Sequence, residues 1–496
     1  MENTTRRNFI KKSAITTAGV TILPSYVVSG LGHRAPSDKL NIVGVGVGGK
    51  GRPNLIGMDT ENIIGLCDVD WKYATKTFEQ FPAAKKYKDW RVMFDELGKD
   101  MDAVMVATAD HTHAIVAATA MTLGKHVYCQ KPLTHSIYES RLLTRLAAKH
   151  KVATQMGNQA NSGDGVRQVC EWIWNGEIGE VREVHSWTDR PIWPQGLQRP
   201  KETMKVPKTM DWDLFIGPAP MRPYHEIYTP WNWRGWWDFG TGAFGDMACH
   251  VLDVVYRSLN LGYPDKIQGS SSLINTESCP QSEKVEFSFP ARDNMPKLGM
   301  PEVKVYWYDG GLFPNRPDLL PEGLDLMSDG LGGCLFIGSK DMLYCECGGF
   351  KPRLLSGRVP NVPQTLRRIP GGSAGYVDGY HEQDWVRACK ESPANRVEGT
   401  SNFAYSGPFN EMVLLGVLAI RLQGLNKILK WDGPNMAFTN ISPSEELKIV
   451  TSNDFKVIDG HPHFDVKHQT FNALESSREY VKHTYREGWK LPDMPV

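Results

Sequence analysis

The sequence predicts an α/β protein with an N-terminal Rossmann domain, a doubly wound parallel sheet, and a C-terminal α+β domain with an open, mostly antiparallel sheet. Short apolar runs alternate with amphipathic stretches from Lys39 onward, which is typical of βαβ units. A glycine-rich turn follows the first apolar run, and strand-like segments dominate after residue 181. We therefore expect one domain at 39–158 and a second at 159–496.

The first domain contains five short apolar runs that predict strands. These runs lie at 40–45, 63–67, 103–107, 126–129 and 153–156. Amphipathic stretches at 113–123 and 137–150 predict helices between the later strands. Ligands of such sheets bind beyond the carboxyl ends of the strands, so the functional site is expected there.

The glycine turn has the spacing of a dinucleotide site, with Gly44, Gly46 and Gly49 as G-x-G-x-x-G. The first two glycines permit a tight turn and close approach of a pyrophosphate, and the third permits close helix packing. Asp68 ends the second strand, 24 residues after Gly44, where its carboxylate can accept hydrogen bonds from the adenosine ribose. Asp70 adds a second negative charge that would repel a ribose 2′-phosphate. The pattern predicts NAD as the cofactor, in preference to NADP.

Polar residues also follow the later strands of this domain. Because the carboxyl ends of parallel strands share one edge of the sheet, these residues should surround one crevice. The further candidates for cofactor binding are Thr108, His113, Gln130 and Asn158. Lys131 is expected in the same crevice.

Three ordered motifs extend beyond the glycine turn. They are A-T-A-D-H-T-H at 107–113, C-Q-K-P-L at 129–133 and G-T-G-A-F-G-D-M-A-C-H at 240–250. Together they resemble the glucose–fructose oxidoreductase, inositol dehydrogenase and rhizopine-catabolism (Gfo/Idh/MocA) family, over nearly the whole chain from residue 39. Two positions depart from the family pattern, since Ala109 replaces the usual proline and Gln130 replaces the usual glutamate.

The resemblance implies that Lys131 binds the reacting sugar hydroxyl near the nicotinamide, and that His250 transfers the proton. It also implies that Asp246 binds substrate or orients His250. Alcohol oxidation needs a base within about 2.6 to 3.2 Å of the hydroxyl oxygen, while the cofactor accepts the hydride. If 246–250 is helical, the i and i+4 spacing places Asp246 and His250 on one face.

The amide of Gln130 keeps hydrogen-bonding capacity but removes a charge that could hold or tune Lys131. Two outcomes are open. Other residues hold Lys131, or its altered state reflects a chemistry different from ordinary dehydrogenation.

The second domain begins with helical spacing at 165–174 and a strand near 181–187. Later strands are predicted at 304–308, 334–337 and 342–347, and a helix at 409–423. These segments fit an open sheet, which the family resemblance also implies.

Seven tryptophans lie between residues 187 and 237. Flat aromatic faces suit the apolar faces of sugar rings, and charged neighbours can bond the hydroxyls. The same rings could equally pack a long insertion or a subunit contact. The candidate substrate residues in this region are Asp189, Arg190, Trp193 and Trp236.

The N-terminus resembles a twin-arginine export signal. T-R-R-N-F-I-K at 5–11 precedes a mildly apolar run at 14–28, which is shorter than the roughly 20 residues of a membrane span. We expect a signal peptide over 1–35, the twin-arginine translocation machinery as a partner, a periplasmic or otherwise exported protein, and no stable membrane anchor. The alternative is an ordinary basic N-terminus.

The amino-acid composition limits the classes of partner and ligand that we expect. Lys plus Arg and Asp plus Glu number 56 each, so no global field favours nucleic acid or an anionic membrane. The nine cysteines lack paired zinc-site spacing and are interpreted as buried thiols, and no metal is expected. We expect a small carbohydrate substrate and a homo-oligomer.

These observations favour an NAD-dependent oxidoreductase that acts on a sugar or glycoside hydroxyl, with carbon three of a keto-sugar pathway as one candidate position. Outside the cytoplasm there is no dependable soluble NAD pool, so an exported enzyme should retain its cofactor and turn over in redox balance. The alternative is a redox-neutral, NAD-dependent glycoside hydrolase. A noncatalytic sugar-binding protein that kept the fold is the remaining possibility.

Overall fold

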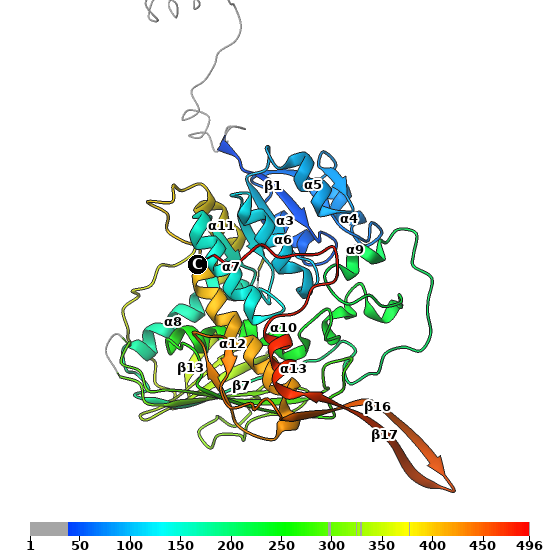
Figure 1. Cartoon of the computed structure of the whole chain (residues 1–496). Helices are drawn as coiled ribbons and strands as arrows, with labels where there is room; N and C mark the ends of the chain where they lie inside the picture. Colours follow the sequence, from blue (N-terminus) through cyan, green and yellow to red (C-terminus); the bar gives the residue numbers. More distant parts are fainter. Residues whose placement is uncertain (1–37, 296–298, 324, 328–329, 376, 496) are drawn as a thin grey trace, which may run out of the picture.

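The computed structural model describes residues 38–295, 299–323, 325–327, 330–375 and 377–495. The predicted signal peptide at 1–35 lies outside this part of the chain. The described residues form two large sheets with helices packed on them, and a long hairpin that projects from the second sheet (Figure 1).

The first sheet has six parallel strands in the order β3-β2-β1-β4-β5-β6, which is the doubly wound Rossmann order. Its strands are β1 (Asn41–Val45), β2 (Asn62–Cys67), β3 (Lys85–Tyr87), β4 (Ala103–Val106), β5 (His126–Cys129) and β6 (Thr154–Met156). Five of them confirm the predicted runs. Strand β3 was not predicted, because its three residues include two exposed lysines and show no apolar run.

The helices of this region are α3 (Gly51–Gly57), α4 (Thr75–Gln80), α5 (Trp90–Leu97), α6 (Asp110–Thr122) and α7 (Ile137–His150). The α7 helix has the predicted bounds, and it begins at a capping box in which Ser136 and Glu139 satisfy each other's backbone amides. The α6 helix begins three residues earlier than predicted, because the chain turns immediately after the extended residue Ala109.

The second sheet has nine strands in the order β13-β12-β11-β7-β10-β9-β8-β14-β15. Only β7 and β10 pair in parallel among these described strands, so the sheet is mostly antiparallel, as predicted. The strands are β7 (Val181–Thr188), β8 (Lys266–Ser271), β9 (Glu283–Phe289), β10 (Val303–Tyr308), β11 (Gly332–Gly338), β12 (Met342–Glu346), β13 (Phe350–Leu354), β14 (Leu429–Asp432) and β15 (Ala437–Phe438).

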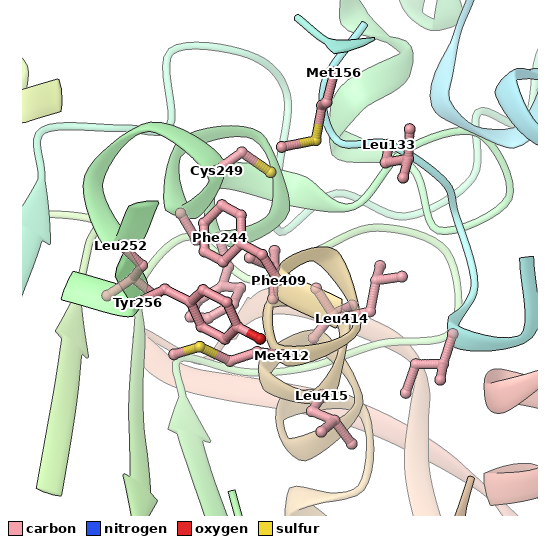
Figure 2. Close-up of a cluster of buried hydrophobic side chains, with 14 of the residues drawn as sticks. Leu133, Met156, Phe244, Cys249, Leu252, Tyr256, Phe409, Met412, Leu414 and Leu415 are labelled. Carbon is pink, nitrogen blue, oxygen red and sulfur yellow. The ribbon is translucent and has the colours of Figure 1, made fainter. Parts of the chain in front are cut away.

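Two long helices, α10 (Gly242–Ser258) and α12 (Phe403–Arg421), pack face to face in the core (Figure 2). Phe244 of α10 contacts Trp307 of β10 with ring centroids 5.1 Å apart. The α12 helix is long and apolar enough to cross a membrane, but 83% of that stretch is buried inside the protein. It therefore serves as a core helix. All nine cysteines are buried, in agreement with their interpretation as buried thiols.

A helix from far along the chain covers part of the first sheet. Helix α11 (Tyr380–Cys389) places Trp385 edge-on against Tyr128 of β5, at 5.7 Å between ring centroids, within an apolar cluster that includes Ile42 and Met105. Residues of the predicted second domain thus cover the first sheet. The predicted division at residue 158 stays a prediction.

The remaining elements are α8 (Asp164–Trp174), α9 (Trp212–Ile216), α13 (Ala473–Val481) and the two hairpin strands β16 (Glu446–Ile458) and β17 (His461–Asn472). The α8 helix confirms the predicted helix at 165–174. The hairpin extends away from the body of the molecule (Figure 1), and its Phe455 and Phe464 rings pack together while remaining exposed.

We expect Trp385→Ala to lower the free energy of unfolding by about 3–5 kcal/mol, because it empties a fully buried site between α11 and the first sheet. Urea denaturation followed by circular dichroism measures the change. Leu123→Ala, at a half-exposed position, is the control and should change the free energy by less than about 0.5 kcal/mol. Equal denaturation midpoints for the two variants would show that α11 does not stabilise the first sheet.

Candidate active site

The carboxyl ends of the first sheet open into a cavity of about 360 Å³. Such a volume lies within the range of small-molecule sites. The cavity walls come from four parts of the chain. They are the strand ends of the first sheet, the long segment 189–241 between β7 and α10, which we call the insertion, helix α10, and the C-terminal segment 482–495. The lining residues include Gly46, Gly49, Asp68, Thr108, Gln130, Lys131, Phe215, Trp231, Trp233, Arg234, His250 and Trp489.

The glycine turn approaches the neighbouring strand end closely. Gly46 has φ +78°, and a Cβ there would lie 2.6 Å from the Ala107 backbone, so only glycine fits. Close helix packing was predicted for Gly49, but Gly51 is the glycine that permits it. Gly51 opens α3, and a Cβ on it would lie 2.1 Å from the Gly46 carbonyl oxygen, whereas a Cβ on Gly49 would meet only the Tyr73 hydroxyl at 2.9 Å.

Gly44, the first glycine of the motif, lies in β1 and packs against the Val47 and Leu55 side chains rather than lining the cavity. Its small size lets α3 approach the strand. The residues of the turn that line the cavity are Gly46, Gly49 and Lys50.

Asp68 lies at the cavity wall and holds the glycine turn in place. Its Oδ2 accepts the backbone N–H groups of Val47 and Gly48, each at 2.9 Å, and its Oδ1 accepts that of Asp70, also at 2.9 Å. Burial raises the pKa of Asp68 to about 6, although the three amides oppose the shift. The side chain thus positions the turn in addition to facing the predicted ribose site.

Lys131, Asp246 and His250 are brought together as the family motifs imply. The Lys131 Nζ donates to Asp246 Oδ1 at 2.6 Å and to the Asp246 carbonyl at 3.2 Å. Burial opposes ionisation of Asp246, but the charges of Lys131 and Arg234 outweigh it and lower the pKa of the carboxyl below its usual range. Asp246 is therefore a carboxylate that fixes the ammonium group at the cavity wall.

His250 follows Asp246 by one turn of α10 and lines the same cavity, which confirms the predicted helical spacing. Burial, and then the charge of Lys131, lower the pKa of His250 to about 3. The imidazole is neutral near pH 7. The neutral imidazole is the form that can act as a proton acceptor.

Gln130 does not hold Lys131. Its Nε2 donates to Asn54 Oδ1 at 2.8 Å, and Asn54 in turn donates to Glu382 Oε1 at 2.6 Å. A buried chain of hydrogen bonds therefore leads from Gln130 through Asn54 to the carboxylate of Glu382. Of the two outcomes left open by the sequence, the geometry favours the first, in which another residue, Asp246, holds Lys131.

Two predicted cofactor ligands lie outside the cavity. The ring nitrogens of His113 lie 2.9 Å from the Pro132 carbonyl and 3.1 Å from the Thr108 carbonyl, so this histidine links the two loops. Asn158 contacts Asp253 Oδ1 at 3.2 Å and accepts from the Ser401 hydroxyl at 2.6 Å. Both side chains are about 1% exposed and cannot reach a ligand, because their polar atoms are used inside the core.

The four candidate substrate residues also lie outside the cavity. Asp189 and Arg190 form an ion pair with each other, and Trp236 is fully buried against Tyr228. Trp193 is nearly buried and donates from Nε1 to Gln195 at 2.8 Å. None of these four described residues lines the cavity.

Other aromatic residues of the insertion line the cavity instead. Trp231 and Trp233 flank the guanidinium of Arg234, with each ring centroid 4.3 Å from its Cζ. Sequence reasoning found the tryptophan-rich region but not these members, because tryptophans in a core and at a cavity have the same pattern. The W-N-W-R run at 231–234, where an arginine follows alternating tryptophans, was the available signal.

The insertion is bonded directly to the first sheet. The Trp71 N–H donates to the Thr209 carbonyl at 3.1 Å, and the Asp211 N–H donates to the Val69 carbonyl at 2.9 Å. These contacts bring Met210, Leu214 and Phe215 to the cavity beside the end of β2.

The C-terminal segment closes another part of the wall. Arg486 pairs with Asp213 of α9 at 2.6 Å, and the Tyr485 hydroxyl donates to Glu139 Oε1 at 2.7 Å. Trp489 reaches the cavity and lies beneath Arg91, whose Cζ is 4.7 Å from the ring centroid. Nothing in the sequence around Trp489 indicated this position.

No group of three or more histidine, cysteine, aspartate or glutamate residues in the described part of the chain is arranged to hold a metal ion. At the cavity wall, the ammonium of Lys131 and the guanidinium of Arg234 both pair with Asp246, and the imidazole of His250 lines the same cavity.

Curated relatives share parts of the sequence. Inositol 2-dehydrogenase 3 of Saccharopolyspora erythraea is 31% identical over 282 residues, which cover 55% of this chain and 79% of that protein. Levoglucosan dehydrogenase of Pseudarthrobacter phenanthrenivorans is 24% identical over 190 residues, covering 38% of this chain and 40% of that protein. The match thus spans about two fifths of the levoglucosan dehydrogenase. It also spans 44% of the inositol 2-dehydrogenase of Salmonella typhimurium.

Solved structures share the fold. The WlbA dehydrogenase of Bordetella pertussis, in complex with NADH and UDP-GlcNAcA, superposes with a TM-score of 0.53 at 15% identity, covering 79% of this chain and 99% of that one. An inositol dehydrogenase homolog of Azotobacter vinelandii, complexed with NADH and myo-inositol, gives a TM-score of 0.51 at 16% identity, covering 79% of this chain and 98% of that one.

Two family models match in chain order. Residues 39–158 match the oxidoreductase family model with the NAD-binding Rossmann fold, and residues 181–288 match the C-terminal alpha/beta domain of the same family. With the S. erythraea relative, these matches show that the chain belongs to the Gfo/Idh/MocA oxidoreductase family.

Proposed function

We propose that the protein oxidises a hydroxyl group of a sugar or glycoside with NAD bound in the cavity. The observation that carries the proposal is the group formed by Lys131, Asp246 and His250 at the strand ends, beside the glycine turn. The cavity suits a dinucleotide, because the glycine turn that precedes α3 lines it, and such a turn can bind a pyrophosphate. Family relatives named for inositol and levoglucosan support the substrate class.

Bound NAD would supply the hydride acceptor. The ammonium of Lys131, fixed by Asp246, binds the hydroxyl oxygen of the substrate and stabilises negative charge that develops on it. The neutral imidazole of His250 takes the hydroxyl proton. Asp246 positions Lys131, and the glycine turn and Asp68 position the cofactor.

We favour NAD over NADP because Asp68 and Asp70 both lie at the end of β2 and line the cavity. Their negative charges would repel a ribose 2′-phosphate. The NADH complexes of the two solved relatives agree with this preference.

We further propose that the cofactor is retained through turnover and that the protein is exported through the twin-arginine pathway to the periplasm, as a homo-oligomer. The walls that the insertion and Trp489 add to the cavity support retention, since they offer a bound dinucleotide contacts beyond those of the first sheet. Turnover would then be redox-balanced, through a second sugar or through reversible oxidation, with carbon three as one candidate position.

The activity test uses protein purified without added nucleotide. We expect bound NAD in the purified protein and its stoichiometric reduction, with a keto-sugar product, when glucosides or galactosides are added. Absorbance of reduced nicotinamide and mass spectrometry of the sugars measure both. Free sugar released without net reduction would replace the proposal by a redox-neutral hydrolase, and absence of both nucleotide and turnover would indicate a binding protein.

Lys131→Met and His250→Gln should each lower kcat by about 10²- to 10⁴-fold, because they remove the group that binds the reacting oxygen and the group that takes its proton. Steady-state kinetics of sugar oxidation measures the loss. The matched controls are Lys85→Met, on an exposed strand residue, and His150→Gln, at the end of α7, which should retain wild-type kcat. Full turnover by His250→Gln would remove this histidine from the mechanism.

We expect the His250 imidazole to stay neutral from pH 8 down to pH 5, because burial lowers its pKa to about 3 and protonation is completed only below that value. Nitrogen chemical shifts of selectively labelled histidine measure this, with the signal assigned by its loss in His250→Gln. A titration of this signal with a midpoint near 6.5 would contradict the burial seen in the structure.

A further inference from the structure

Arg234 is an unusual feature of the cavity wall. Its guanidinium lies between the rings of Trp231 and Trp233, both 4.3 Å from Cζ, and 6.0 Å from the ring of Trp193. The side chain is 12% exposed, and it lines the cavity. The faces of Trp231 and Trp233 attract the cation and help to hold it in one place.

The orientation of Arg234 is fixed by one hydrogen bond. Its Nε donates to Asp246 Oδ1 at 2.8 Å. A guanidinium carries five N–H donors, so four remain on the two terminal nitrogens. Among the residues that the structure describes, none accepts a hydrogen bond from these terminal nitrogens. The guanidinium is thus fixed through Nε, and its two terminal nitrogens are available to a ligand.

The local charge is not balanced by the protein. Lys131 and Arg234 both bond the same oxygen of Asp246, so two cations share one carboxylate. The next acid, Asp110, is buried and accepts from the Thr241 hydroxyl at 2.9 Å. Burial raises the pKa of Asp110 to about 7, so its charge is incomplete at neutral pH. His250 is neutral. A net positive charge therefore faces the cavity at this point.

We infer that the substrate is a sugar acid, and that Arg234 binds its carboxylate while Lys131 binds the hydroxyl to be oxidised. A guanidinium fork matches the two oxygens of a carboxylate better than it matches neutral hydroxyls. Because both cations bond one oxygen of Asp246, the bound carboxylate and hydroxyl must be only a few covalent bonds apart on one molecule. The assignment rests on the proposed oxidation of a sugar hydroxyl, and it narrows the substrate to uronides and related hydroxy acids.

The test compares matched sugars that differ only in the carboxylate: methyl β-glucuronide with methyl β-glucoside, and methyl β-galacturonide with methyl β-galactoside. We expect kcat/KM for each uronide to exceed that for its neutral partner by at least about tenfold, and Arg234→Gln to remove about 10- to 100-fold of kcat/KM for the uronides, the size of one hydrogen bond to a charged group. In Arg234→Gln the ratio of kcat/KM between each uronide and its neutral partner should fall to about one, chiefly because KM for the uronide rises.

Arg199→Gln is the matched control, since Arg199 lies in the same insertion, pairs with Glu277 and does not line the cavity. It should keep the preference for uronides. A wild-type preference for the neutral sugars would overturn the inference and leave the proposed oxidation intact. If Arg234→Gln instead loses bound NAD while the remaining activity keeps its preference, Arg234 serves the cofactor, and the inference is wrong.

A binding measurement decides the inference even if no sugar is oxidised. Trp231 and Trp233 flank the expected carboxylate site, so quenching of tryptophan fluorescence should report ligand binding there. We expect methyl β-glucuronide to bind at least about tenfold more tightly than methyl β-glucoside, and this difference to vanish in Arg234→Gln. Equal affinities in the wild-type protein would contradict the inference, whereas failure of turnover alone would contradict only the proposed function.

Discussion

Two cations, Lys131 and Arg234, share one oxygen of the buried Asp246 carboxylate, and the geometry of the candidate site depends on this contact. Lys131 comes from the end of β5, Arg234 from the insertion, and Asp246 from α10. The carboxylate thus ties the first sheet, the insertion and the core helix together. Removing one partner of such a buried pair leaves an uncompensated charge, which typically costs about 3–5 kcal/mol. The contact that places the reacting groups therefore also makes the junction of the first sheet, the insertion and α10 sensitive to the loss of either partner.

Segments distant in sequence complete the first sheet and its cavity. Helix α11 covers the sheet, Glu382 of that helix ends the hydrogen-bond chain from Gln130 through Asn54, and the insertion bonds the loop after β2. The substitution of Gln130 for the usual glutamate is consistent with this arrangement, because the Gln130 amide donates to Asn54, while Asp246 of α10 supplies the carboxylate that holds Lys131. The cofactor region is therefore built by the whole chain rather than by the first domain alone.

The sequence was sufficient for elements whose signal is local. Apolar runs predicted five of the six strands of the first sheet, and α7 has its predicted bounds because periodicity and a capping box agree there. The motifs also identified Lys131, Asp246 and His250, since spacing on one helix fixes two of them. The sequence did not predict which side chains point into the core and which reach the cavity. His113, Asn158 and Trp236 turn into the core, whereas Trp231, Arg234 and Trp489 reach the cavity, and no periodic pattern distinguishes these directions.

The position of Trp489 has a consequence for the order of assembly during synthesis. The cavity wall contains Gly46, near the start of the first sheet, and Trp489, more than four hundred residues later. A nascent chain that has folded its first sheet on the ribosome still lacks α11 and this part of the wall. The cavity wall seen in the structure is therefore complete only after translation has passed residue 489. Most of the described chain must be synthesised and folded before the site takes its final form.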